Sequence, residues 1–212
     1  MNIIQPGVAL WEKKISSLSL LVHLYSLPYR SVVEKEIDLA GILEGQTVLN
    51  IGCGAVPFTA IYLAELAKAR VFALDCDAEA VVKARRVVDK VGLRDRITVI
   101  HGDGARDAEI DFEIALVALQ ARPKKEIFEK LFKDAPSGGR LVFRQVSSRF
   151  AGHYDSLAVD ERPVAETRQG MKTFDRSVLF VKRAFEQAAD SFIYHYGSGS
   201  PSEESATPCC MG

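Results

Sequence analysis

Between residues 40 and 185, short apolar runs alternate with segments whose apolar positions recur at helical spacing. The runs are typical of buried strands and predict them over residues 47–51, 70–74, 97–100, 112–118, 140–144 and 177–182. The helical spacing predicts helices over residues 57–69, 77–91 and 124–133. Repeated strand–helix units of this length predict an α/β protein with a Rossmann-like, mostly parallel sheet and helices on both faces.

The segments on either side of this pattern are less regular. Residues 17–36 favour a helix with a break near Leu27–Pro28, and we expect this segment to cover the carboxyl edge of the sheet. Residues 145–176 form a long polar stretch, which is typical of a functional loop. These features divide the chain into a helical N-terminal cover (1–40), a Rossmann-like domain (41–196) and a Gly/Ser/Pro/Glu-rich, disordered tail (197–212).

Composition narrows the class of partner. The chain is 48% hydrophobic and 26% charged with a net charge of −1, which favours a globular protein with a small-molecule substrate over one that binds nucleic acid or a membrane surface. The apolar run at residues 18–24 is too short to span a bilayer, and Trp11 and Glu12 interrupt any apolar signal core. A cytoplasmic protein is therefore expected.

The cysteines Cys53, Cys76, Cys209 and Cys210 do not have zinc-ligand spacing. We interpret them as reduced thiols and predict no metal site.

Candidate chemistry begins at the loop after the first predicted strand, NIGCGAVPFT at residues 50–59. Gly52 permits a tight turn, and Gly54 lets a ligand approach the backbone without meeting a Cβ atom. The third glycine of the usual dinucleotide fingerprint is replaced by Val56–Pro57. Pro57 suits the first turn of the next helix, whose free N–H groups favour an anionic group.

Two acidic residues follow the next two predicted strands. Asp75 is placed to accept the hydroxyl groups of a ribose, and Asp103, between Gly102 and Gly104, to accept an adenine amino group. Together they favour an adenosine-containing ligand. The alternatives remain open: the glycines can be ordinary turn residues, Asp75 a helix-capping residue and Asp103 a solvated turn residue.

The order of strand, Gly-x-Gly, acidic residue and Gly-Asp resembles the class I S-adenosylmethionine-dependent methyltransferases over residues 45–182. The stretch Val56-Pro57-Phe58-Thr59 is similar to the nicotianamine synthase family, whose members transfer the aminocarboxypropyl arm of S-adenosylmethionine. Other segments carry the same resemblance: residues 99–103, 116–118, 122–125, 143–144, 149 and 177–182. The predicted ligand-binding residues are Gly52, Cys53, Gly54, Pro57, Asp75, Cys76, Gly102, Asp103, Gly104, Ala118 and Leu119.

The resemblance also implies catalytic candidates. The stretch around Pro28–Tyr29 is similar to the part of the family that carries an active-site tyrosine, so Tyr29 is the candidate. The family has a large helical domain before the Rossmann domain, whereas about forty residues precede it here. Its catalytic acid has no assigned counterpart; Glu34 and Glu36 are the nearest acidic residues.

S-adenosylmethionine has three activated carbons, and geometry selects which one reacts. Attack of its own amine on the γ-carbon closes a four-membered ring and gives azetidine-2-carboxylate and methylthioadenosine, without an acceptor pocket. Arg144 and Arg149 are candidates to hold the carboxylate, Tyr29 to contact the amine or sulfonium, and Gln120 to orient the amine. His101 and His153 are weaker candidates for a base.

Three functions stay open. The protein can act on the γ-carbon, by ring closure or by transfer to an external amine. It can be a small-molecule methyltransferase, or a non-catalytic S-adenosylmethionine-binding subunit. Helical covers often pair across a twofold axis, so a homodimer is a further expectation.

Overall fold

The structure is a computed structural model that describes residues 18–107, 110–157 and 159–183, with side chains from Tyr29 onward. The chain divides into a unit of Met1–Lys182 and a second unit of Arg183–Gly212. The first unit is described below. The predicted tail at residues 197–212 lies outside the described residues.

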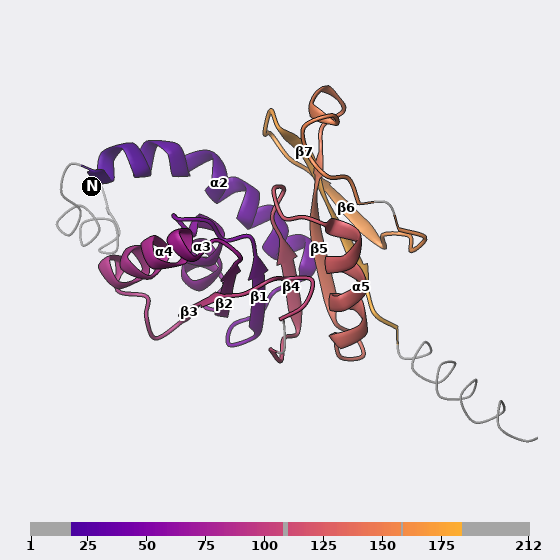
Figure 1. The fold of residues 1–212 in the computed structure, drawn as a ribbon, viewed down its shortest axis with the longest axis horizontal. Coiled ribbons are helices and arrows are strands. Elements are labelled where there is room, and N and C mark those ends of the chain that lie inside the picture. Colours follow the sequence, from indigo (N-terminus) through magenta and orange to yellow (C-terminus); the bar gives the residue numbers. More distant parts are fainter. Residues whose placement is uncertain (1–17, 108–109, 158, 184–212) are drawn as a thin grey trace, which may run out of the picture. The chain divides into compact units, whose positions relative to one another are not determined.

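The first unit is an α/β fold with a seven-stranded sheet in the order β3-β2-β1-β4-β5-β7-β6 (Figure 1). Its elements are α2 (Leu18–Ala40), β1 (Thr47–Ile51), α3 (Phe58–Leu66), β2 (Arg70–Asp75), α4 (Ala78–Val91), β3 (Ile97–His101), β4 (Ile114–Val117), α5 (Lys124–Asp134), β5 (Arg140–Val146), η1 (Ser148–Phe150), β6 (Ala165–Arg168) and β7 (Phe174–Val181). Strand β7 is antiparallel to both of its neighbours, and the other pairs are parallel. The predicted Rossmann-like fold is confirmed.

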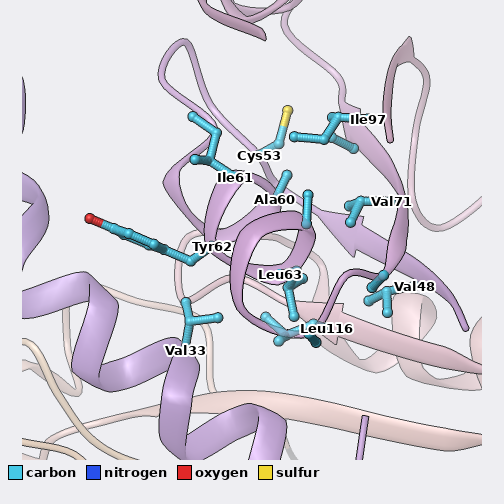
Figure 2. Packing of buried hydrophobic residues seen from close by; sticks show 14 of the residues in the cluster. Val33, Val48, Cys53, Ala60, Ile61, Tyr62, Leu63, Val71, Ile97 and Leu116 are labelled. Atoms are coloured by element: carbon cyan, nitrogen blue, oxygen red, sulfur yellow. The ribbon is translucent and has the colours of Figure 1, made fainter. Parts of the chain in front are cut away.

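Successive residues of each central strand pack on opposite faces of the sheet, in two layers of the core. Val48 of β1 packs with α2, α3 and α4, and Figure 2 shows part of this layer around α3. Leu49, the next residue, packs instead with α5 and the phenylalanines of β5 and β7. Because both faces are covered, the central strands are mostly apolar on both sides, which is why the sequence shows nearly continuous apolar runs.

Helix α4 has a defined cap at each end. The Asp77 carboxylate accepts the backbone N–H groups of Glu79 (2.8 Å) and Ala80 (3.3 Å). Gly92 ends the helix in the left-handed conformation with φ 72°, which costs glycine little. The strand β2 and helix α4 are therefore joined by a short, well-defined turn.

Two expectations about the N-terminal helix are wrong. Helix α2 runs without a break through Pro28, because the turns after it are held by buried Val32, Val33 and Glu36. It also crosses one face of the sheet instead of covering the carboxyl edge alone. Its last residue, Ala40, accepts a hydrogen bond from Arg140 at the amino end of β5, at 2.6 Å.

The stretch 145–176 is more ordered than the predicted loop. It contains the end of β5, η1, strand β6 and the start of β7. Strand β6 lies at the sheet edge, and its residues are exposed apart from a half-buried Thr167. It therefore lacks the apolar alternation by which a strand is recognised. Within the described residues, no helix is both long and apolar enough to cross a bilayer.

Candidate ligand-binding site

Two neighbouring cavities lie where the strand order reverses, beyond the carboxyl ends of β1 and β4. We call them the Asp75 cavity, of about 490 Å³, and the Tyr29 cavity, of about 300 Å³. Both are lined by Gly52, Gly54, Gln120 and Tyr154. Reversal points of open α/β sheets are the usual place for ligands, and these volumes suit small molecules.

The glycine loop forms the boundary between the cavities. Gly52 and Gly54 have φ of 78° and 68°, a conformation that residues with a Cβ rarely adopt. A Cβ on Gly52 would lie 3.2 Å from that of Ala118, whereas one on Gly54 would meet no atom within 4 Å. The Gly54 backbone therefore faces open space, as the sequence predicted for a backbone that a ligand approaches.

Asp75 bonds to the backbone on two sides. Its Oδ2 accepts the N–H of Gly54 at 2.7 Å, and its Oδ1 accepts the N–H of Asp77 at 3.0 Å. The carboxylate thus fixes the glycine loop and the turn before α4. Each oxygen keeps a lone pair, so the same carboxylate can accept hydroxyl groups from a ligand in the Asp75 cavity, which it lines.

The predicted Gly-Asp-Gly turn lies on the same cavity. Gly102, Asp103 and Gly104 all line it, together with Cys76. A Cβ on Gly104 would lie 2.7 Å from Cγ2 of Ile51, so only glycine lets this turn pack against β1. Asp103 Oδ1 accepts the N–H of Ala105 at 2.9 Å, and its Oδ2 lies 3.7 Å from Nε of the exposed Arg106.

The Tyr29 cavity brings together residues that are distant in sequence. Its lining includes the predicted residues Tyr29, Cys53, Ala118, Leu119 and Arg144. The Tyr29 ring stacks on Phe58 with centroids 5.8 Å apart and an interplanar angle of 23°. Tyr29 is thereby held by α3, and the N-terminal helix contributes directly to the wall of the site.

Arg144 does not have the freedom that the sequence suggested. Its Nε and Nη2 donate to the two carboxylate oxygens of Glu36 at 2.9 and 2.7 Å, and Nη2 also donates to Thr59 at 3.1 Å. The guanidinium edge expected to bind a substrate carboxylate therefore binds Glu36. The reason is burial: both side chains are almost wholly inaccessible, and a buried charge requires a partner.

The Glu36–Arg144 pair belongs to a buried polar network. Ser177 donates to Glu36 Oε1 at 2.7 Å, and Gln169 donates to Ser177 at 3.1 Å. The Phe174 ring lies 5.5 Å from the guanidinium carbon. Burial disfavours the charged guanidinium, but the Glu36 carboxylate outweighs this effect and raises the pKa of Arg144 above its ordinary value. Arg144 is therefore a charged but compensated group in the cavity wall.

The remaining predicted ligand-binding residues differ in exposure. Cys53 is buried, and that burial, together with Asp75, raises the pKa of its thiol to about 12, so the thiol stays neutral. Cys76 is exposed. Pro57 is buried at the N-cap of α3 and is not among the residues that line the two cavities. Its carbonyl accepts the N–H of Ile61 at 3.0 Å, so it sets the start of the helix instead.

The structure adds residues that sequence reasoning missed. Tyr154, Asp155 and Thr173 line the cavities, and His153, considered only as a base, lines the Asp75 cavity. Length and polarity marked the segment 145–176 as functional, but no pattern indicated which residues face a ligand. Arg149 is exposed on η1 and is absent from both linings. His101 contacts the Cys76 carbonyl at 3.1 Å.

Across the described ranges, no group of three or more His, Cys, Asp or Glu side chains is arranged to hold a metal ion.

Comparison with known families identifies the chain. The family model for protein-L-isoaspartate(D-aspartate) O-methyltransferase (PCMT) matches residues 25–150, which is more than half of the sequence. The chain belongs to the PCMT family. The match begins within α2 and ends at η1, so it includes the glycine loop, Asp75 and Asp103.

Two curated relatives match the PCMT-family chain in part. The L-histidine 2-aminobutanoyltransferase of Yersinia pestis is 31% identical over 121 residues, which cover 57% of this chain and 45% of that protein. The protein-L-isoaspartate O-methyltransferase of Thermococcus onnurineus is 34% identical over 108 residues, covering 50% of this chain and 47% of that protein. The chain therefore spans about half the length of the curated relatives that it matches.

Solved structures share the fold. MtNAS in complex with MTA and tNA superposes with a TM-score of 0.69 at 24% identity, covering 77% of this chain and 63% of that one. A mutant of MtNAS in complex with S-adenosylmethionine gives 0.70 at 23% identity, covering 81% and 70%. At this level of identity the likeness shows the class I methyltransferase fold.

Proposed function

We propose that this protein is an S-adenosylmethionine-dependent enzyme in which an amine attacks the γ-carbon of the aminocarboxypropyl arm. The observation that carries the proposal is the pair of neighbouring cavities. They share the glycine loop, Gln120 and Tyr154, so one ligand can extend from the Asp75 cavity into the Tyr29 cavity. The second cavity is small and is lined by side chains from α2, α3 and the sheet.

The Asp75 cavity suits the nucleoside. Adenosine offers hydroxyl groups on the ribose and an amino group on the base, all of which donate hydrogen bonds. Asp75 and Asp103 supply carboxylate acceptors in the same cavity, and Gly54 presents a backbone without a side chain in the way. The matched donor and acceptor groups support S-adenosylmethionine as the ligand.

The Tyr29 cavity suits the reactive arm. Tyr29 and Gln120 are polar groups that can contact an amine, and aromatic rings such as Tyr29 favour a neighbouring cation. Glu36 occupies one edge of the Arg144 guanidinium, so Arg144 offers a ligand carboxylate only its remaining Nη1 hydrogens. A neutral wall of this kind accommodates a zwitterionic amino acid group.

The proposed step breaks one bond and forms one. A neutral amine nitrogen bonds to the γ-carbon, the bond from that carbon to sulfur breaks, and the electron pair leaves on sulfur as methylthioadenosine. The nitrogen then loses a proton. Attack by the ligand's own α-amine gives azetidine-2-carboxylate, and attack by another amine gives an aminocarboxypropylated product.

Two relatives support γ-carbon chemistry. The name of the Yersinia pestis relative states transfer of a 2-aminobutanoyl group to histidine, and this group has the same four carbons as the aminocarboxypropyl arm. The MtNAS complex contains MTA, the usual abbreviation of methylthioadenosine. These proteins share the fold or part of the sequence with this chain, so they guide the proposal and its test.

The second candidate is methyl transfer, and the PCMT family match favours it. The two candidates release different nucleosides: γ-carbon attack gives methylthioadenosine, and methyl transfer gives S-adenosylhomocysteine. The nucleoside product therefore separates them without knowledge of the acceptor.

The test is a product assay with purified protein and S-adenosylmethionine, analysed by liquid chromatography and mass spectrometry. Methylthioadenosine with equimolar azetidine-2-carboxylate is the expected result for ring closure. Methylthioadenosine that forms only after an amine is added indicates transfer to that amine. S-adenosylhomocysteine would overturn the proposal in favour of methyl transfer, and binding without any product would favour a non-catalytic subunit. The Asp75→Ala variant serves as the negative control.

A further inference from the structure

Residues 147–157, which we call the strap, run along both cavities. His153, Tyr154 and Asp155 line the Asp75 cavity, and Tyr154 also lines the Tyr29 cavity. Tyr154 packs against the apolar cluster that contains Val32. The position of the strap therefore determines the shape of both cavities at once.

Hydrogen bonds join the strap to the rest of the fold at its start and near its end. At its start, the N–H of Ser147 donates to the carbonyl of Thr173 at 3.1 Å, and the Ser147 hydroxyl donates to the carbonyl of Lys172 at 3.0 Å. Near its end, Asp155 is attached to helix α5. The cavity-lining residues His153 and Tyr154 come immediately before this second attachment.

Lys124 and Asp155 form that attachment through two hydrogen bonds, which we call the clasp. The backbone N–H of Lys124 donates to Asp155 Oδ2 at 2.7 Å, and the Lys124 Nζ donates to the Asp155 carbonyl at 2.7 Å. Residue Pro123 occupies the N-cap of α5 and has no side-chain acceptor. Asp155 therefore caps α5 from a distant segment, since the first N–H groups of a helix require acceptors.

The environment of Lys124 shows that its ammonium group has a specific task. The residue has an exposed fraction of 0%, and burial lowers the pKa of its amine, an effect that Asp155 opposes. An apolar side chain of the same length would fill this space without desolvating a charge. What the ammonium adds is the bond to the Asp155 carbonyl, so its contribution is to hold the strap.

We propose that Lys124 is a positioning residue: through Asp155 it holds the strap across both cavities and thereby slows release of the bound ligand. Lys124 itself lines neither cavity, so it acts through His153 and Tyr154. The proposal rests on the proposed function only in taking S-adenosylmethionine as the ligand, and it applies equally to γ-carbon attack and to methyl transfer.

The test compares Lys124→Met with Lys125→Met, a control at the next position. Lys125 is exposed and pairs only with Glu129 across one helical turn, at 3.8 Å. Association and dissociation of radiolabelled S-adenosylmethionine are measured for each full-length protein. Lys124→Met is expected to release the ligand about tenfold faster with association unchanged, since it loses a hydrogen bond made by a charged group. The control is expected to match the wild type.

A second readout reports the strap itself. Arg149 lies within the strap and is exposed, so trypsin cleavage after it measures how often the strap detaches. Lys124→Met is expected to be cut there about tenfold faster than wild type without ligand. Unchanged release and unchanged cleavage would overturn the proposal.

If Lys124→Met does not fold, Asp155→Ala provides the same test at an exposed position. This variant loses the cap on α5 but keeps the Nζ bond to the backbone, so faster cleavage after Arg149 is again expected, by about threefold. A wild-type protein that does not bind S-adenosylmethionine would contradict the proposed function. Cleavage after Arg149 still tests the clasp in that case, because this readout needs no ligand.

Discussion

The two cavities are built in different ways. In the Asp75 cavity, the predicted acidic residues Asp75 and Asp103 lie at the end of β2 and in the turn after β3, and they accept hydrogen bonds from backbone N–H groups. In the Tyr29 cavity, by contrast, the lining residue Arg144 of β5 bonds to Glu36 of α2, which lies behind the wall, and both side chains are buried. One cavity keeps acceptors free for a ligand, and the other has satisfied its charges internally.

This difference predicts that variants in the two regions fail in different ways. A buried ion pair that loses one partner leaves an uncompensated charge, which destabilises the whole fold. When a partly exposed carboxylate is replaced, water can solvate the groups that it had bonded, so the fold is little affected. The ligand loses a contact, so its affinity falls instead. The predictions below separate these outcomes, beginning with the largest expected effect.

Removal of Glu36 is expected to destabilise the fold most. The Glu36→Ala variant leaves Arg144 buried without its carboxylate partner, and the free energy of unfolding is expected to fall by about 3–5 kcal/mol. Urea unfolding followed by circular dichroism measures it. The exposed Glu34→Ala variant is the control, since its pairing with Arg30 contributes only about 0–1 kcal/mol.

The double variant Glu36→Leu with Arg144→Leu sharpens the same point. Removing both charges eliminates the uncompensated guanidinium, so this protein is expected to be more stable than Glu36→Ala. A double variant that is less stable than Glu36→Ala would contradict this explanation. It would show that the Glu36–Arg144 pair stabilises the fold by more than the compensation of two buried charges.

Substitution of Asp75 is expected to affect binding more than folding. Asp75→Ala loses acceptors for the ligand and the bond that fixes Gly54, so affinity for S-adenosylmethionine is expected to fall about 100-fold by calorimetry. Asp77→Ala is the matched control: it removes the cap of α4 and about 1 kcal/mol of stability, with affinity retained. Equal losses of affinity in both variants would contradict a ligand role for Asp75.

Substitution of Tyr29 is expected to separate the two cavities. Tyr29→Ala removes a ring from the Tyr29 cavity and leaves the Asp75 cavity unchanged, so turnover is expected to fall about tenfold. Affinity for methylthioadenosine, which lacks the amino acid arm, is expected to stay unchanged because the Asp75 cavity is intact. A matching loss of methylthioadenosine affinity would show that the cavities do not act independently.

Glu113 provides a reference at the opposite edge of the sheet, with the smallest effect. The pKa of Glu113 is lowered below its ordinary 4.5, mainly by a hydrogen bond from the Thr47 N–H and to a smaller extent by one from the Gln46 side chain. A lowered pKa contributes stability above the unfolded value and loses it as the pH falls. Glu113→Gln is therefore expected to be less stable at pH 7 by under about 1 kcal/mol, and the difference is expected to disappear below pH 4.5. A difference that grows on acidification would contradict this assignment.

The sequence by itself determined strands β1 to β5 and β7, the helices that follow β1 and β2, and the glycine and aspartate positions of the Asp75 cavity. These features depend on periodicity and on turn residues such as Gly52, Gly54 and Asp75, whose conformational and hydrogen-bonding preferences act over a few positions. The carboxyl ends of parallel strands meet at one edge, so residues that follow successive strands come together in any such fold.

Only the tertiary structure decided the rest. The partner of Arg144 is Glu36, 108 positions away, and Lys124 binds Asp155, 31 positions away. Neither contact has a local signal, because each forms to compensate a charge or a helix end that becomes buried only when the layers pack. Packing also explains why α2 continues unbroken through Pro28. Position at the sheet edge explains why β6 is a strand although its residues are exposed.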